Sequence, residues 1–228
     1  MMFVFIHGAG CMAEIFSAQV RAFPDSLSFA LPGHGTPGSP RSVGEFADAI
    51  DRQIAERELD RVVLAGSSMG GAIALELALR RHPAVRAVVL LGASGKLRVA
   101  PAIFAGIDED FPAAAQSIVR NFFAEPTPEL MAPSLTQMLA VGQAQTRRDF
   151  EACNSFDVMD RLSEIAVPLL ALSGEKDVLV PPKFAQAAAD RVPGAQARIV
   201  PAAGHLLFVE RPAETNAALR AFVHQIAS

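Results

Sequence analysis

Residues 62–71 read V-V-L-A-G-S-S-M-G-G and carry the strongest indication of the fold in this chain. Its apolar β-branched run is typical of a buried strand, and an alanine-rich segment of helix-forming residues follows it. Between them stands the pattern G-x-S-x-G, which requires the order strand, sharp turn, helix. Gly66 and Gly70 leave room where the two elements approach each other, so Ser68 between them is the candidate nucleophile. An ordinary glycine-serine turn in a strand-helix unit would carry the same letters, and the rest of the chain has to separate the two interpretations.

Length and composition favour one α/β domain that binds neither nucleic acid nor membrane. The 228 residues are enough for a single sizeable core, with 51% hydrophobic and 19% charged residues. No apolar run approaches the roughly 18 residues that cross a bilayer, and the first residues lack the basic leader of a secretory signal. The net charge of -4 comes with scattered Lys and Arg rather than with a basic patch. Cys11 and Cys153 have neither disulfide-framework nor metal-ligand spacing, so we expect a cytoplasmic protein without a metal.

Short apolar runs alternate with helical patterns along most of the chain. We expect strands at 3–6, 28–31, 61–65, 85–91, 168–172 and 197–200. We expect helices at 13–23, behind the S-x-x-E capping box at 42–45, at 72–79, at 182–191 and from Pro212 onward. Six strands separated by helices imply a mostly parallel sheet with helices on both faces and a site at the carboxyl ends of the strands.

The segment 95–162 breaks this alternation. It carries helical patterns punctuated by proline and no strand-like run, yet it is too rich in Phe and Met for a solvated loop. We therefore expect a helical insertion at 95–162, packed on a core formed by 1–94 and 163–228. The candidates for lining an apolar substrate pocket are Phe104, Phe123 and Met138 from the insertion and Cys11 from the first glycine-rich turn. For the Cys11 thiol, the role of a small buried hydrophobe is favoured over that of a pocket-lining residue.

A serine hydroxyl is too weak a nucleophile at neutral pH without a base, and the base needs an orienting carboxylate. Asp177 follows the strand expected at 168–172, and His205 follows the next strand. The chain order Ser, Asp, His, with each member after a strand, is far more specific than the pentapeptide alone. Asp177 is favoured because the turn that follows it would aim it inward. The rival acids are Glu175 and, more weakly, Asp157 and Asp160.

The tetrahedral intermediate of acyl transfer needs N–H donors for its oxyanion. The Met69 amide directly after the nucleophile is one, and the turn H-G-A-G at 7–10 supplies another. We choose Ala9 in that turn, and Gly10 stays open as the alternative. His7 is expected to brace the turn by hydrogen bonding. The remaining histidines show no partner pattern and are expected on the surface of loops or helices: His34, His82 and His224.

These motifs resemble those of the α/β-hydrolase superfamily over nearly the whole chain. The matching stretches are H-G-A-G at 7–10, L-P-G-H-G at 31–35, G-S-S-M-G-G at 66–71, S-G-E-K-D at 173–177 and G-H at 204–205. The resemblance implies an α/β-hydrolase fold with the triad Ser68, Asp177 and His205. It also implies an oxyanion hole of the Ala9 and Met69 amides and a helical cap, 95–162, that sets acyl-group specificity. The chain starts at the strand before the H-G turn, without the first two strands usual in the family, so a six-stranded core is implied.

The function expected from these residues is a serine hydrolase that needs no cofactor. The simplest form is a carboxylesterase acting on small or medium acyl esters, as a monomer or a homodimer. Serine at position 68, where dehalogenases and epoxide hydrolases of the superfamily carry aspartate, argues against both of those activities. Carbon-carbon bond hydrolases and hydroxynitrile lyases use the same triad on this fold. A non-enzymatic binding protein of α/β-hydrolase type is the alternative from another class, and the complete triad disfavours it.

Overall fold

The computed structural model describes residues 1–227, and a parallel sheet forms its centre. The sheet is six-stranded with the order β2-β1-β3-β4-β5-β6, and every neighbouring pair is parallel. The strands are β1 (Met2–Ile6), β2 (Leu27–Phe29), β3 (Val62–Ser67), β4 (Val85–Leu91), β5 (Leu169–Gly174) and β6 (Gln196–Val200). The α/β class and the expected strands are confirmed, with some strand ends shifted by a residue or two.

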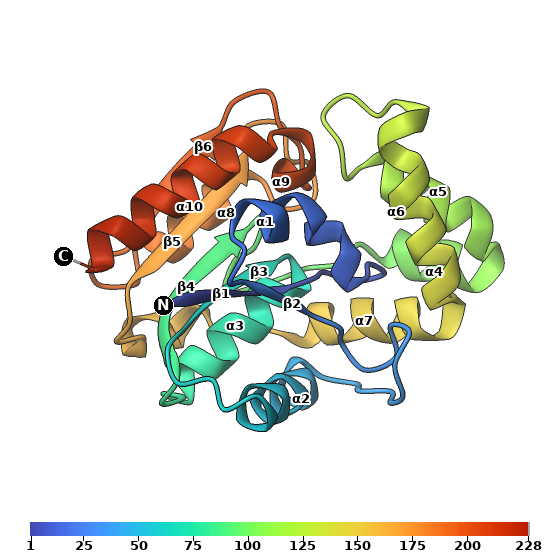
Figure 1. Cartoon of the computed structure of the whole chain (residues 1–228). Helices are drawn as coiled ribbons and strands as arrows, with labels where there is room; N and C mark the ends of the chain where they lie inside the picture. Colours follow the sequence, from blue (N-terminus) through green and yellow to red (C-terminus); the bar gives the residue numbers. More distant parts are fainter. Residues whose placement is uncertain (228) are drawn as a thin grey trace.

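Helices cover both faces of the sheet (Figure 1). Those of the core are η1 (Ala13–Phe16), α1 (Ser17–Ala22), α2 (Val43–Glu56), α3 (Met69–Leu79), α8 (Pro182–Ala189), α9 (Leu207–Glu210) and α10 (Pro212–Ala227). Along each strand, alternate side chains point to opposite faces. Val4 and Leu64 pack in one buried cluster with α2, α3 and α8, whereas Phe5 and Val63 pack in another with α9 and α10. Burial on both sides explains why the strands read as continuous apolar runs.

Local sequence sets the ends of several helices. Helix α2 begins at the expected capping box, where Ser42 Oγ accepts the Glu45 N–H at 3.2 Å and the Glu45 carboxylate accepts the Arg41 N–H at 2.8 Å. Pro212 opens α10 as expected. The helix expected at 13–23 is divided into the 3-10 turn η1 and the short helix α1, and the sequence pattern did not predict α9. Within residues 1–227, every helix is too short or too polar to cross a membrane.

Between β4 and β5 the chain builds the helical insertion. Its helices are α4 (Pro101–Glu109), α5 (Phe111–Arg120), α6 (Pro128–Val141), α7 (Gln143–Ser155) and the 3-10 turn η2 (Met159–Glu164). Helices α4, α5 and α6 lie beyond the end of the sheet at which strand β1 finishes (Figure 1). Helix α7 leads back from there and contacts α3. The insertion therefore lies at the carboxyl ends of the strands. The division into a core and a separate cap at 95–162 stays a prediction.

Candidate active site

Ser68 lies on the sharp turn between β3 and α3. Its backbone angles are φ 51° and ψ -114°, outside the regions that a non-glycine residue favours. The Ser68 N–H donates to the Leu91 carbonyl on β4 at 3.0 Å, which holds the turn against the sheet. A Cβ at Gly66 would lie 2.1 Å from the Gly70 carbonyl oxygen, and a Cβ at Gly70 would lie 2.1 Å from the Ile6 carbonyl oxygen. Close backbone approach thus requires both glycines, as the motif predicts.

The Asp177 carboxylate is buried after the end of β5 and held by three hydrogen bonds. Its Oδ1 accepts the N–H groups of Leu179 and Val180, each at 2.9 Å. Its Oδ2 accepts the Nδ1–H of His205 at 2.8 Å. The turn that follows Asp177 therefore aims the carboxylate at the histidine. The rival acids are all exposed: Glu175, Asp157 and Asp160.

The loop after β6 carries His205, whose side chain is 3% exposed. The Glu210 carboxylate holds this loop, because it accepts the Gly204 N–H at 2.6 Å and the Ala124 N–H of the insertion at 2.9 Å. Since Nδ1 of His205 donates to Asp177, Nε2 is the nitrogen left to take up a proton. His205 lines a cavity that Ser68 also lines.

The turn at 7–10 lies beside the turn that carries Ser68, since a Cβ at Gly8 would lie 3.2 Å from the Ser68 Cβ, and Ala9 lines the same cavity. The Gly10 N–H donates to the Asp149 carboxylate at 2.9 Å. A donor engaged in this way is not directed at a substrate oxygen, so Ala9 is the stronger of the two candidates in this turn. The Met69 amide belongs to the first turn of α3, where N–H groups have no partner within the helix.

His7 braces this turn as a neutral ring. Its Nε2 accepts the Leu31 N–H at 3.2 Å, and its Nδ1 donates to the Gly8 carbonyl at 3.0 Å. Burial first, and the charge of His34 next, lower the pKa of His7 from 6.5 to about 3. His7 therefore serves hydrogen bonding, as expected, rather than proton transfer.

His34 is buried, which corrects the expectation of a surface position. Its Nε2 lies 2.8 Å from Oδ2 of Asp149, and its Nδ1 lies 3.1 Å from the Pro32 carbonyl oxygen. Gln145, one turn before Asp149 on α7, donates to the other carboxylate oxygen at 2.8 Å. Sequence reasoning missed both Asp149 and Gln145, because His34 stands 115 residues before its carboxylate partner. Their spacing of four residues on one helix is the local signal that points to the pair.

A cavity of about 720 Å³ opens in front of Ser68 and His205, which both line it. Most of its lining is apolar and comes from the core and the insertion together, including Cys11, Ile103, Ile118, Phe122, Phe150, Met159 and Phe184. Lys96 and Arg98 also line it, and Lys96 forms an ion pair with Asp157. Cavities of this size and character hold ligands of small to medium size.

In the described structure, three of the four residues expected to line the pocket are not among the residues that line this cavity: Phe104, Phe123 and Met138. The Phe104 ring lies under the Arg147 guanidinium at 5.8 Å, and its neighbour Ile103 lines the cavity instead. Because one step along a helix turns the side-chain direction by about 100°, Ile103 faces the cavity and Phe104 does not. Phe123 is buried in the apolar cluster beside the sheet, and Met138 packs over Gly10.

The sequence profile of the Alpha/beta hydrolase family matches residues 3–218. The match spans all six parallel strands, the turn that carries Ser68 and the loops of Asp177 and His205. The chain belongs to the α/β-hydrolase family. The resemblance read from the sequence is thereby confirmed.

Individual relatives cover most of the chain. Pimeloyl-[acyl-carrier protein] methyl ester esterase of Salmonella typhi is 28% identical over 232 residues, covering 92% of this chain and 89% of its own. Among solved structures, an enzyme described as degrading N-acyl homoserine lactones is 27% identical, covers 97% of this chain and 93% of its own, and gives a TM-score of 0.86. A thermophilic esterase is 26% identical, covers 98% of this chain and 90% of its own, and gives a TM-score of 0.88.

Proposed function

We propose that this α/β hydrolase is a serine carboxylesterase that acts on small or medium acyl esters. Ser68 attacks the ester carbonyl carbon, while His205 takes the hydroxyl proton and then passes it to the leaving alcohol. Asp177 holds the imidazole in the required tautomer, and the Ala9 and Met69 amides stabilise the oxyanion. Water then repeats the same steps on the acyl-enzyme, which releases the acid and restores the serine.

The observation that carries this proposal is the 2.8 Å hydrogen bond between Asp177 and His205, beside a cavity that Ser68 also lines. The strained backbone of Ser68 adds support, because such strain gathers at functional sites. The esterases among the relatives favour ester bonds as the target.

The proposed acyl substrate rests on the cavity and on the names of the relatives. The largely apolar lining would accommodate a hydrocarbon chain, and about 720 Å³ suits a small or medium one. Two relatives are named for acyl compounds, a pimeloyl methyl ester and an N-acyl homoserine lactone. Lys96 and Arg98 would in addition favour a negative charge away from the scissile bond.

Labelling with a fluorophosphonate probe, read by mass spectrometry of the labelled peptide, tests the nucleophile. We expect one phosphonate on Ser68 and none on Ser68→Ala. The neighbouring buried hydroxyl gives a matched control for the label, because Ser67→Ala keeps Ser68 and should still be labelled. Ser68→Ala should stay folded while its turnover falls by about 10⁶-fold, as removal of a triad serine generally does. Near-normal turnover of Ser68→Ala would refute the mechanism, and a wild-type protein that does not react would favour the binding-protein alternative.

A series of p-nitrophenyl esters of increasing acyl length tests the substrate class. We expect kcat/KM to be highest for short and medium chains and to fall once the chain outgrows the cavity. A pair of methyl esters of equal length, one ending in a carboxylate and one neutral, tests the contribution of Lys96 and Arg98. Faster cleavage of a carbon-carbon bond or of a cyanohydrin would favour the alternative activities of this fold.

We also propose a reducing compartment, such as the cytoplasm, as the place of action. Cys11 and Cys153 are both free and buried, and neither is part of a disulfide. Secretion into the medium by the native host would contradict this assignment.

A further inference from the structure

Asp149 is a buried carboxylate that the proposed reaction does not use. It lies on α7 of the insertion, and its residue exposure is 0%. Its Oδ2 accepts the Gly10 N–H at 2.9 Å and the His34 Nε2–H at 2.8 Å, and its Oδ1 accepts the Gln145 amide at 2.8 Å. Burial of a carboxylate is costly unless its partners replace the lost water. These partners join three separate segments of the chain at one point.

His34 is the second side-chain partner of Asp149 in this buried site. Its Nε2 lies 2.8 Å from Oδ2 of Asp149, and its Nδ1 lies 3.1 Å from the Pro32 carbonyl oxygen. Both oxygens of the Asp149 carboxylate are thus engaged beside the Gly10 turn.

We propose that Asp149 and His34 are positioning residues for the oxyanion hole, so that the insertion fixes the turn that carries the Ala9 amide. The inference rests on the proposed function. Gly10 follows Ala9 directly, and the bond from the Gly10 N–H to Asp149 therefore orients the peptide next to the oxyanion donor. Gly10 has φ +64° and no side chain of its own, so contacts from outside hold the turn in this conformation.

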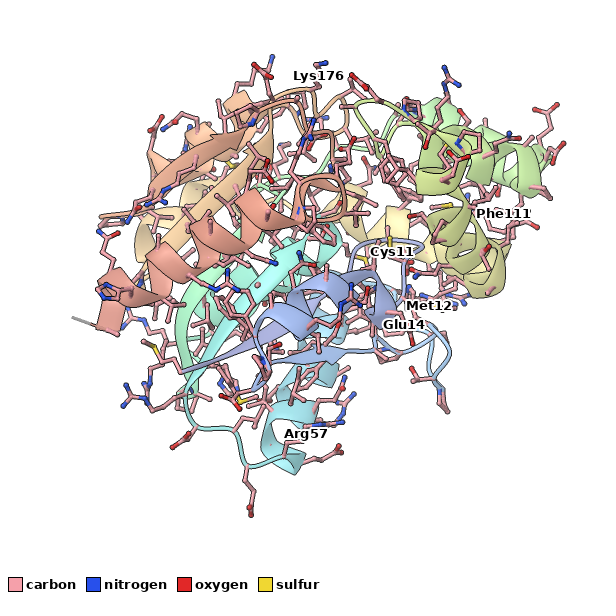
Figure 2. The ribbon with its side chains drawn as sticks, turned by 45° about the horizontal axis from the view of Figure 1, so that its top comes forward. Cys11, Met12, Glu14, Arg57, Phe111 and Lys176 are labelled. Atoms are coloured by element: carbon pink, nitrogen blue, oxygen red, sulfur yellow. The ribbon has the colours of Figure 1, made fainter. Side chains whose placement is uncertain are left out.

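A second helix of the insertion holds the same segment. Gln137 of α6 accepts the Met12 N–H at 2.9 Å. Figure 2 shows Cys11 and Met12 where the N-terminal segment faces the helices of the insertion. The bond at Met12 is only partly buried and lies further from Ala9 than the bond at Gly10. Gln137→Ala should therefore affect turnover less than a change at Asp149.

The variant Asp149→Asn tests this role with almost no change of shape. Its amide nitrogen would face N–H donors whichever way the side chain turns. We expect kcat to fall by about 10- to 100-fold, with KM within about threefold of the wild-type value. The variant would misplace the Ala9 amide that donates to the oxyanion, whereas the substrate pocket would stay intact. The rate of phosphonate labelling of Ser68 should fall in parallel. The exposed Glu151→Gln on the same helix is the matched control and should leave both rates unchanged.

His34→Gln gives an independent variant, because glutamine keeps a donor for Asp149 but lacks the second ring nitrogen that faces the Pro32 carbonyl oxygen. We expect kcat to fall in this variant as well, with little change in KM. If Asp149→Asn does not fold, His34→Gln and Gln145→Ala carry the same test. Wild-type kcat in a folded Asp149→Asn or His34→Gln variant would overturn the inference.

Hydrogen exchange separates this inference from the proposed function, because it needs no substrate. The amides of residues 8–12 should exchange faster in Asp149→Asn than in the wild type or in Glu151→Gln. Unchanged exchange in a folded variant would overturn the inference even if esterase activity is proven. A wild-type protein that neither hydrolyses esters nor reacts with the probe would refute the proposed function, while the exchange rates would still decide whether Asp149 holds the turn.

Discussion

Asp177 and His205 form a hydrogen bond of 2.8 Å although they stand 28 residues apart in the chain. They meet because each follows one of two neighbouring strands, β5 and β6, whose parallel pairing brings both carboxyl ends to the same edge of the sheet. Two backbone N–H groups bind the other carboxylate oxygen, so the Asp177 carboxylate is held in a fixed orientation toward His205.

Replacement of this acid by its amide should abolish most of the turnover without unfolding the protein. In Asp177→Asn the histidine loses the acceptor that sets its tautomer, and we expect kcat to fall by about 10⁴-fold. The exposed Glu175→Gln, two residues earlier, is the control and should keep its activity. Steady-state kinetics on a p-nitrophenyl ester and thermal unfolding of both variants check this. A comparable loss in Glu175→Gln would reassign the acid.

A methyl group at Gly70 should destabilise the protein strongly. The added Cβ would lie 2.1 Å from the Ile6 carbonyl oxygen of β1, so strand and helix would have to separate. We expect Gly70→Ala to lower the free energy of unfolding by about 3 kcal/mol or more. Gly106→Ala in α4 is the control, since its Cβ would make only an ordinary 3.5 Å contact and should stabilise by about 0.5–1 kcal/mol. Urea unfolding of both variants measures the difference.

The stability of the protein should fall at acidic pH through His7. Burial and the charge of His34 lower the pKa of His7 to about 3, so the unfolded chain binds this proton more tightly than the folded protein does. The stabilising contribution is complete above pH 6.5 and is lost as the pH falls toward about 3, by up to about 1.4 kcal/mol per pH unit. Urea unfolding between pH 7 and pH 4 should show a shallower decline for His7→Gln than for the wild type. Equal slopes would exclude His7 as the cause.

The two thiols should resist alkylation in the folded protein. Burial first, and the charge of Asp149 next, raise the pKa of Cys11 to about 12 and raise the pKa of Cys153 as well. At pH 8 the Cys11 side chain is then a protonated thiol. Iodoacetamide should label neither cysteine until denaturant is added, as measured by the mass of the intact chain. Rapid labelling of native Cys153→Ala would show that Cys11 is reactive within the cavity.

Features that depend on neighbouring residues were predictable from the sequence. The strand Val85–Leu91 has the same bounds as the apolar run that predicted it. The glycines around Ser68 lie where the backbone leaves no space for a side chain. The pairing of Asp177 with His205 was also predictable, because neighbouring parallel strands bring their carboxyl ends together.

Features that depend on the rotation of a helix or on distant partners were not predictable. Phe104 was expected to line the pocket, whereas its neighbour Ile103 lines the cavity, because an apolar residue on a short helix can face the cavity or the outside of the insertion. The burial of His34 depends on Asp149, and no spacing in the sequence relates two residues so far apart. Propensity and periodicity describe elements, whereas these contacts arise when the elements pack.

The Glu210 carboxylate, which accepts the N–H groups of Ala124 and Gly204, has a consequence for how substrates reach Ser68. With Asp149 on the opposite side, it ties the insertion to the core both near the histidine and near the glycine turn. Moving the insertion away from the core would break the partly buried bond at Ala124 and the buried bond at Gly10, each worth about 0.5–1.5 kcal/mol and more where a charge is left unpaired. The insertion is thus fixed to the core at two points, and the exposed residues Val178 and Phe184 lie among those that line the cavity.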